Sequence, residues 1–212
     1  MGKPTGVAAK QLRALDRLKT LAPLAGFYLA GGTAIAFHLR HRRSLDLDLF
    51  SATADVDFDV IRRSLAVLPE GVSVIAETDA ALKVLLLGEP VDLVRYPYAP
   101  LEHPTAGPSG FPVAGLLDLA VMKMAAVARR GIRRDFWDLR VLLGTGLTLG
   151  VAGEAYLQRF GVNESDLYHV ARALTYFADA EKDPAFPAGM TMESWSEIQR
   201  FFEAEAPKLL PR

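Results

Sequence analysis

The 212-residue chain contains no cysteine. It therefore forms no disulfide bond, no thiolate metal site and no cysteine nucleophile, and it is compatible with a reducing compartment. Long apolar runs are also missing, because stretches such as Val84 to Gly88 are far shorter than the roughly 20 residues that a membrane-spanning helix needs. These two absences exclude a disulfide-stabilised scaffold and a helical membrane protein.

Neither sign of charge dominates the sequence, since it contains 24 Lys and Arg residues and 25 Asp and Glu residues, which give a formal net charge of −1. No global attraction to nucleic acid or to an anionic membrane is expected, so any basic surface must be local. The N-terminal segment carries scattered charges and has no apolar core of signal-peptide length. Half of the residues are hydrophobic, which suits a packed globular protein. We expect a cytoplasmic protein.

Hydrophobic periodicity predicts a mixed α/β first part and a helical second part. Helices are expected at 8–24, 34–41 and 56–68, and strands at 27–30, 44–50, 72–77, 82–87 and 91–96. Five prolines and two glycines between 97 and 112 predict a long loop or a domain boundary. The remaining helices are expected at 116–130, 133–144, 149–160, 165–180 and 194–205. The predicted domains are a core with a small mixed sheet at 1–112 and a helical region at 113–212.

The segment S-L-D-L-D-L-F, residues 44–50, alternates polar and apolar side chains as a strand with one polar face does. Asp46 and Asp48 would project to the same side, while Leu45, Leu47 and Leu49 face the core. Two neighbouring carboxylates repel each other unless a cation lies between them. Mg²⁺ is the expected cation because it prefers oxygen ligands and is often held by one or two carboxylates and substrate phosphates. The alternative is a half-exposed strand with two solvated aspartates.

Gly31-Gly32-Thr33 lies upstream of this strand, separated from it by one predicted helix. Backbone N–H groups at a glycine turn that opens a helix form an anion site, and glycine lets a phosphate approach the backbone closely. Thr33 is predicted to cap the helix. A phosphate cradle, one helix and a carboxylate pair together indicate a site for a nucleoside triphosphate.

A second group of charged residues lies in the helical part. Lys123 belongs to one predicted helix, and Asp135 and Asp138 belong to the next. Residues three apart share a helix face, so the two aspartates should point the same way. The alternative is a helix with ordinary surface ion pairs and an aromatic core contact through Phe136 or Trp137.

The pattern G-G-T, a helix and S-x-D-x-D resembles the signature of the DNA polymerase beta-like nucleotidyltransferase superfamily. Together with L-x-x-x-K followed by R-D-x-x-D-L, it is similar to the AbiEii/AbiGii-type nucleotidyltransferase toxins, which include MenT-like enzymes. The resemblance runs from about Phe27 to about Leu143. It implies a nucleotidyltransferase-like core followed by a C-terminal helical region that completes the active site and contacts the acceptor.

The resemblance also implies roles for single residues. Gly31, Gly32, Thr33 and Ser44 would lie near the triphosphate, with Lys123 close to the phosphates and Asp135 or Asp138 as the acidic residue that follows it. Asp46 and Asp48 would bind two Mg²⁺ ions. Asp92 would be the third carboxylate, which either binds a metal ion or helps to deprotonate the acceptor. Because Asp92 follows Pro90 closely, it could instead lie at a turn. The expected substrate is a nucleoside triphosphate, the expected acceptor tRNA, and the expected partner an antitoxin.

Two other functions remain open at this point. A small-molecule nucleotidyltransferase of the antibiotic-inactivating kind would share the metal site, and the near-neutral charge favours it. An RNA-binding face would need the arginines between 40 and 43 and between 129 and 134 to converge. A non-catalytic nucleotide-binding module on the same fold is the third possibility, because a fold does not determine a function.

Overall fold

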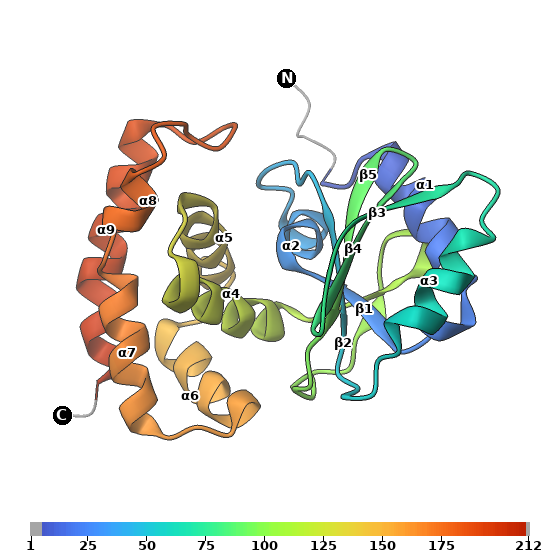
Figure 1. Ribbon diagram of the computed structural model, residues 1–212. Coiled ribbons are helices and arrows are strands. Elements are labelled where there is room, and N and C mark those ends of the chain that lie inside the picture. The colour runs from blue at the N-terminus through green and yellow to red at the C-terminus, as the bar shows by residue number, and fades with distance from the viewer. Residues whose placement is uncertain (1–5, 211–212) are drawn as a thin grey trace. The chain divides into compact units, whose positions relative to one another are not determined.

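The computed structural model describes residues 6–210 and divides into two compact units, Met1–Gly115 and Leu116–Arg212 (Figure 1). The first five residues of the N-terminal segment, in which no signal peptide is expected, lie outside the described residues. Within the described range, no helix is both long and apolar enough to cross a membrane.

The first unit is built on a mixed seven-stranded sheet with the order β3-β4-β5-β2-β1-β7-β6. Strand β2 pairs in parallel with β5, and β1 pairs in parallel with β7, whereas the other neighbours are antiparallel. The predicted small mixed sheet is confirmed. The strands are β1 Phe27–Ala30, β2 Leu47–Ser51, β3 Val72–Thr78, β4 Ala81–Leu86, β5 Glu89–Arg95, β6 Thr105–Ala106 and β7 Pro112–Val113.

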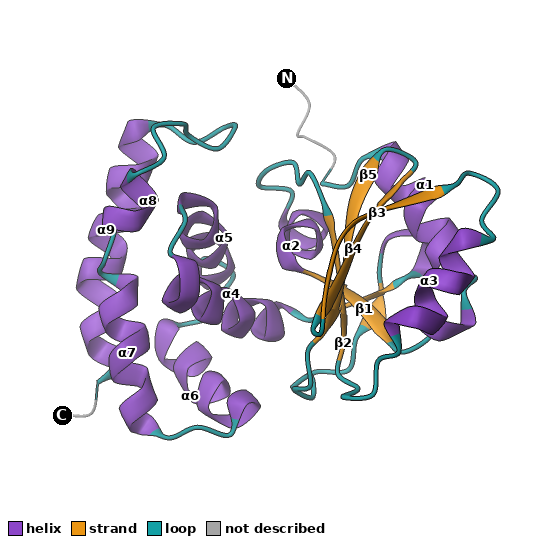
Figure 2. Cartoon of the chain, in the orientation of Figure 1, coloured by secondary structure: helices purple, strands orange, loops and turns teal. Residues whose placement is uncertain are grey.

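Helices flank both faces of this sheet. Figure 2 shows α1 (Ala9–Leu18) and α3 (Phe58–Ala66) on one side and α2 (Gly31–Leu39) on the other. Strand β2 alternates as predicted, and β5 does so as well, because Leu49 and Leu93 are fully buried while Asp48 and Asp92 are only partly buried. The apolar side chains therefore form the core, and the carboxylates occupy the opposite face of the two central strands.

Several predicted boundaries in this unit are wrong. The helix expected at 8–24 ends at Leu18, and a 3₁₀ turn, η1 (Ala22–Leu24), follows with Pro23 near its start, where a proline is tolerated. Gly31 to Thr33 form the first turn of α2 rather than a separate turn, and the Thr33 hydroxyl donates to the Asp46 carbonyl instead of capping the helix. Residues 97–112, expected to be a long loop or a domain boundary, are not a plain loop, because they include β6, the 3₁₀ turn η2 (Pro108–Gly110) and the start of β7, which joins the sheet beside β1.

The strand expected at 44–50 begins only at Leu47. Strand β1 turns into α2 after Ala30, so its ladder with β2 ends at the pair Ala30–Asp48. Leu45, expected in the core, is 65% exposed. Asp46 therefore lies one residue before the strand, in a segment whose position depends on side-chain hydrogen bonds.

The second unit is helical, as predicted. Its elements are α4 Leu116–Arg130, α5 Arg133–Leu143, α6 Leu149–Phe160, α7 Glu164–Leu174, α8 Ala178–Glu181, α9 Met192–Glu205 and the 3₁₀ turn η3 Ala206–Leu209. The single helix expected at 165–180 is wrong, because Thr175 ends α7 and α8 follows after Phe177. The Phe136 ring packs at 5.7 Å from Trp195 and 5.6 Å from Phe202, measured between centroids, in the core of this unit.

Candidate functional site

The central strands place two of the predicted carboxylates directly opposite each other. Asp48 on β2 pairs in register with Asp92 on β5, so both side chains point to the same face of the sheet. Asp46 precedes β2 by one residue, and its carboxylate accepts a hydrogen bond from the Ser44 hydroxyl at 3.3 Å. The structure thus brings Ser44, Asp46, Asp48 and Asp92 to the same end of the sheet.

Gly31 and Gly32, in the first turn of α2 and called the glycine turn below, lie directly against this carboxylate face. Gly31 has a φ of +59°, and a Cβ placed there would collide with the Asp48 carboxylate. A Cβ on Gly32 would lie 2.5 Å from the Arg42 guanidinium and 3.1 Å from the Ser44 hydroxyl. Glycine is required at Gly31, where φ is positive and Asp48 lies against the backbone, whereas a side chain at Gly32 would displace the Arg42 guanidinium.

Two side chains that the sequence did not single out in these roles hold the segment between α2 and β2. Gln11 of α1, only 1% exposed, donates from Nε2 to the Ser44 carbonyl at 3.3 Å. The buried Thr33 hydroxyl donates to the Asp46 carbonyl. These hydrogen bonds fix the backbone on both sides of Leu45. They therefore position Ser44 and Asp46, which precede β2 and so are not held by hydrogen bonds between strands.

Lys83 is a functional candidate that sequence reasoning missed. It lies on β4 opposite Asp92, and its Nζ is 3.0 Å from Asp92 Oδ2. The hydrogen bond to Asp92 raises the pKa of Lys83, and the charges of Asp46 and Asp48 act in the same direction. The ammonium group therefore stays protonated and is close enough to all three carboxylates to respond to their charge.

Carboxylate oxygens are the ligands that Mg²⁺ prefers, and Asp46 and Asp48 lie beside a glycine turn suited to phosphate, so this pair fits a magnesium ion. Asp92 differs because one of its oxygens is in contact with Lys83. Among residues 6–210, no three His, Asp or Glu side chains are grouped closely enough to hold a metal ion. The donor set therefore fits metal binding by Asp46 and Asp48, with Asp92 engaged elsewhere.

The second predicted group lies in the helical unit and is buried. Lys123 Nζ is 2.8 Å from Asp135 Oδ1 and 2.9 Å from Asp138 Oδ2, so the two aspartates share a face of α5. The Arg130 Nε also lies 2.7 Å from Asp135 Oδ2. Both aspartate side chains are fully buried, and that of Lys123 is 9% exposed. The alternative of ordinary surface ion pairs does not describe this cluster.

The charges in this cluster stabilise one another. Burial alone lowers the pKa of Lys123, but the carboxylates of Asp138 and Asp135 outweigh it and raise that pKa. Burial alone raises the pKa of Asp135, but the Lys123 ammonium and the Arg130 guanidinium hold it below its ordinary value. Lys123 and Asp135 are therefore both ionised at neutral pH.

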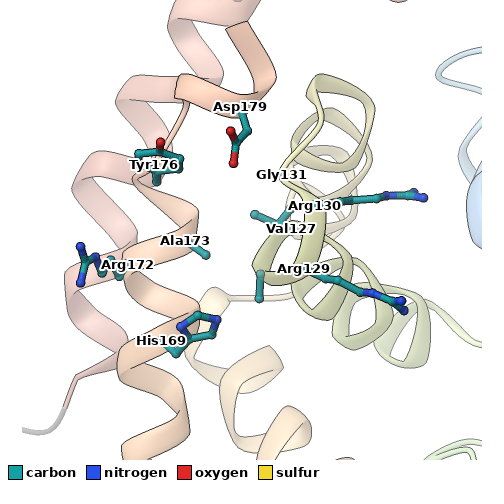
Figure 3. A pocket seen from close by; sticks show the side chains of 10 residues that line it. Val127, Arg129, Arg130, Gly131, His169, Arg172, Ala173, Tyr176 and Asp179 are labelled. Carbon is teal, nitrogen blue, oxygen red and sulfur yellow. The ribbon is translucent and has the colours of Figure 1, made fainter. Parts of the chain in front are cut away.

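Of the arginines between 129 and 134, Arg133 does not contribute to a basic surface. Arg133 is buried, with its guanidinium 4.4 Å from the centre of the Phe186 ring and donating to the carbonyl of Ala185 at 3.2 Å. A cavity of about 390 Å³ is lined by the end of α4 and by α7. In Figure 3, the side chains of Arg129 and Arg130 extend away from α7, and Arg172 extends to the opposite side. These arginines do not converge on the cavity.

Comparison with known proteins gives one relative along the whole chain. No family model matches the sequence. The uncharacterized protein aq_aa25 of Aquifex aeolicus (strain VF5) is 30% identical over 205 residues, which cover 95% of this chain and 96% of that protein. The chain belongs to the same family as this Aquifex protein.

Solved structures establish the fold of this family. MenT4, a nucleotidyltransferase toxin from Mycobacterium tuberculosis, has a TM-score of 0.57 at 17% identity and covers 92% of this chain and 82% of its own. JHP933 from Helicobacter pylori has a TM-score of 0.52 at 18% identity, covering 93% and 90%. ANT(2″)-Ia, solved with adenylyl-2″-tobramycin, has a TM-score of 0.54 at 15% identity, covering 72% and 99%. The predicted nucleotidyltransferase fold is confirmed, and the AbiEii-type assignment stays a prediction.

Proposed function

We propose that this protein is a magnesium-dependent nucleotidyltransferase, which transfers a nucleoside monophosphate from a triphosphate to an acceptor. The proposal rests on one observation, the geometry of the first turn of α2. Gly31 lies against the Asp48 carboxylate, and Gly32 lies against Arg42 and Ser44. This turn joins a site for phosphate oxygens to a site for a hard cation. Both are needed to handle a nucleoside triphosphate.

In the proposed reaction, an acceptor hydroxyl oxygen forms a bond to the α-phosphorus and its proton passes to solvent. The bond from the α-phosphorus to the α,β-bridging oxygen breaks, and pyrophosphate leaves. Mg²⁺ held by Asp46 and Asp48 would neutralise charge on the phosphates. The N–H groups at the start of α2 would orient the triphosphate, with the Ser44 hydroxyl and the Arg42 guanidinium beside Gly32. Positioning and charge neutralisation supply most of the catalysis in such transfers.

We propose tRNA as the acceptor and a toxin role with a cognate antitoxin. The likeness to MenT4, a nucleotidyltransferase toxin, supports the toxin role, because it extends over 92% of the chain and so reaches into the helical unit. The choice of tRNA rests on the resemblance of the sequence motifs to the toxin family. Lys123 with Asp135 and Asp138 would belong to the active site, Lys123 near the phosphates, as the resemblance to the toxin family implies. The exposed Arg43, Arg129 and Arg134 are available for contacts with RNA phosphates.

A small-molecule acceptor is the second candidate. Two observations favour it: the net charge of −1, and the arginines of the helical unit, which point in different directions (Figure 3). An RNA-binding surface is usually a basic patch or stripe. ANT(2″)-Ia, whose structure holds an adenylylated tobramycin, has the same fold. A non-catalytic module, in contrast, would bind nucleotide without transferring it.

The proposal is tested by incubating the protein with Mg²⁺, total tRNA and each α-labelled nucleoside triphosphate in turn. We expect label on the tRNA with one preferred nucleotide. Asp48→Asn, like Asp46→Asn, should reduce transfer by at least about 100-fold, the size of effect seen when one electrostatic group of an active site is removed. Asp59→Asn is the matched control, because Asp59 is 63% exposed and pairs with Arg62 away from the glycine turn.

Each result has a distinct meaning. Transfer that is equal in Asp48→Asn and the wild type would overturn the assignment of the site. Nucleotide binding without labelled tRNA, but with label on an aminoglycoside, would establish the small-molecule alternative. Nucleotide binding without any transfer would establish the non-catalytic module.

A further inference from the structure

Lys83 stands in a row of charged residues that crosses three neighbouring strands. Lys83 on β4 is in register with Asp92 on β5, and Asp92 is in register with Asp48 on β2. Adjacent strands lie about 4.8 Å apart. All three side chains point to the same face, because residues in register do so. The ammonium and the two carboxylates thus form one short line that ends at Gly31.

The contact of Lys83 with this row is direct. Its Nζ is 3.0 Å from Asp92 Oδ2, and the side chains of Lys83 and Asp92 are 39% and 23% exposed. The pKa of Lys83 is raised first by its hydrogen bond to Asp92 and also by the charges of Asp46 and Asp48. An ordinary cross-strand ion pair joins one ammonium group to one carboxylate. Here the charges of three carboxylates, those of Asp92, Asp46 and Asp48, act on the Lys83 ammonium.

The position of Lys83 limits what a second metal ion can do. A divalent cation bound by Asp92 would share that carboxylate with an ammonium group 3.0 Å away from one of its oxygens, and like charges at such distances repel. Asp48 lies at the other end of the row, next to Gly31, and Asp46 precedes β2 by one residue. A divalent ion is therefore expected at Asp46 and Asp48 rather than at Asp92, whose carboxylate is in contact with the Lys83 ammonium.

We propose that Lys83 is a resident cation of this site: its ammonium occupies the place beside Asp92 that a second divalent ion would take, so the protein binds one divalent ion instead of two. This inference rests on the proposed function, since it concerns the metal content of the same site. It makes Asp92 the anchor of Lys83, and it makes Lys83 a positioning residue that keeps a positive charge beside Asp92 without a second metal ion.

The number of bound ions tests this inference independently of catalysis. The full-length protein is titrated with Mn²⁺, alone and with the α,β-methylene analogues of the four nucleoside triphosphates, and free Mn²⁺ is measured by electron paramagnetic resonance. We expect one ion per chain for the wild type, two for Lys83→Met and one for Lys83→Arg, which keeps the charge. Lys19→Met controls for the loss of one positive charge in the same unit, because Lys19 pairs with Asp16 on α1, and should bind one ion.

Two ions in the wild type, or one ion in Lys83→Met, would overturn the inference. A wild type that binds two ions and still labels its acceptor would overturn the inference alone and leave the proposed function intact. A wild type that binds no ion and labels no acceptor would overturn the proposed function, and the inference with it. Thermal unfolding of each variant shows whether a change in stoichiometry accompanies a change in fold.

Discussion

At the scale of single residues, Gly31 links the backbone to the chemistry of the site. Its φ of +59° is a conformation that side-chain-bearing residues rarely adopt, and its Cα lies against the Asp48 carboxylate. Gly31→Ala should therefore have two effects. It should lower the free energy of unfolding by about 1–2 kcal/mol through the strained φ, and it should push the Asp48 carboxylate away from the glycine turn.

The second effect predicts that Gly31→Ala weakens nucleotide binding in the presence of Mg²⁺ by at least about tenfold, which corresponds to about 1.4 kcal/mol. Gly71→Ala is the matched control, because Gly71 has a φ of +72° but has open space where a Cβ would be placed. It should show the loss of stability without the loss of binding. Chemical unfolding and titration with a fluorescent nucleotide measure the two effects, and normal binding by Gly31→Ala would contradict the prediction.

The roles of single residues were only partly predictable from the sequence. The spacing of Asp46 and Asp48 indicated that they act together, and the period of two placed Leu47 and Leu49 in the core. Gln11 could not be found in this way, because its hydrogen bond to the Ser44 carbonyl joins residues 33 positions apart. Such long-range side-chain contacts leave no periodic pattern in the sequence.

At the scale of elements, the hairpin of β4 and β5 decides which residue faces Asp92. The strands expected at 82–87 and 91–96 leave residues 88–90 between them, but the two loop residues are Leu87 and Gly88, with φ values of +56° and +78°. Positive φ at both central residues is typical of a type I′ turn. From the pair Leu86–Glu89, the register leads directly to Lys83 opposite Asp92. The sequence did not indicate this turn, because leucine is rarely found at a positive φ. For the same reason, it did not indicate that Lys83 pairs with Asp92.

Leu87→Asn should stabilise this hairpin. Asparagine followed by glycine is the preferred sequence for a type I′ turn, and relief of the positive φ at Leu87 is worth about 1 kcal/mol in the free energy of unfolding. Gly88→Ala, at φ +78°, should have the opposite sign and about the same size. Urea unfolding monitored by circular dichroism measures both, and a loss of stability in Leu87→Asn would show that the apolar contacts of Leu87 outweigh the strain.

At the scale of the whole molecule, the sequence predicted the change from a mixed α/β part to a helical part, because the hydrophobic period changes along the chain. The residues expected in the site fall in both compact units: the glycine turn and the carboxylates belong to Met1–Gly115, and Lys123 with its two aspartates belongs to Leu116–Arg212. The burial of Lys123 was not predictable, since spacing shows which side chains share a face but not whether water reaches them.

The buried cluster around Lys123 predicts how stability depends on pH. Asp135 has a folded-state pKa below its ordinary value of 3.8, so it contributes stability above about pH 4 that is lost as the pH falls through the folded-state pKa. Lys123 has a folded-state pKa above 10.5, so its contribution is complete below pH 10.5 and is lost as the pH rises through the folded-state value. Stability should therefore fall at both extremes of pH and stay level between them.

Asp135→Asn tests the acid side of this dependence. The variant should lose about 3–5 kcal/mol at pH 7, because it removes one partner of a buried ionic cluster. Its free energy of unfolding should also fall less steeply than that of the wild type below pH 4, since it no longer takes up a proton at this position on unfolding. Asp16→Asn is the control, as Asp16 is 51% exposed and pairs only at the surface with Lys19, and it should follow the wild-type curve. Denaturant unfolding between pH 3 and 7 measures all three proteins, and equal acid slopes for Asp135→Asn and the wild type would show that other carboxylates carry the acid sensitivity.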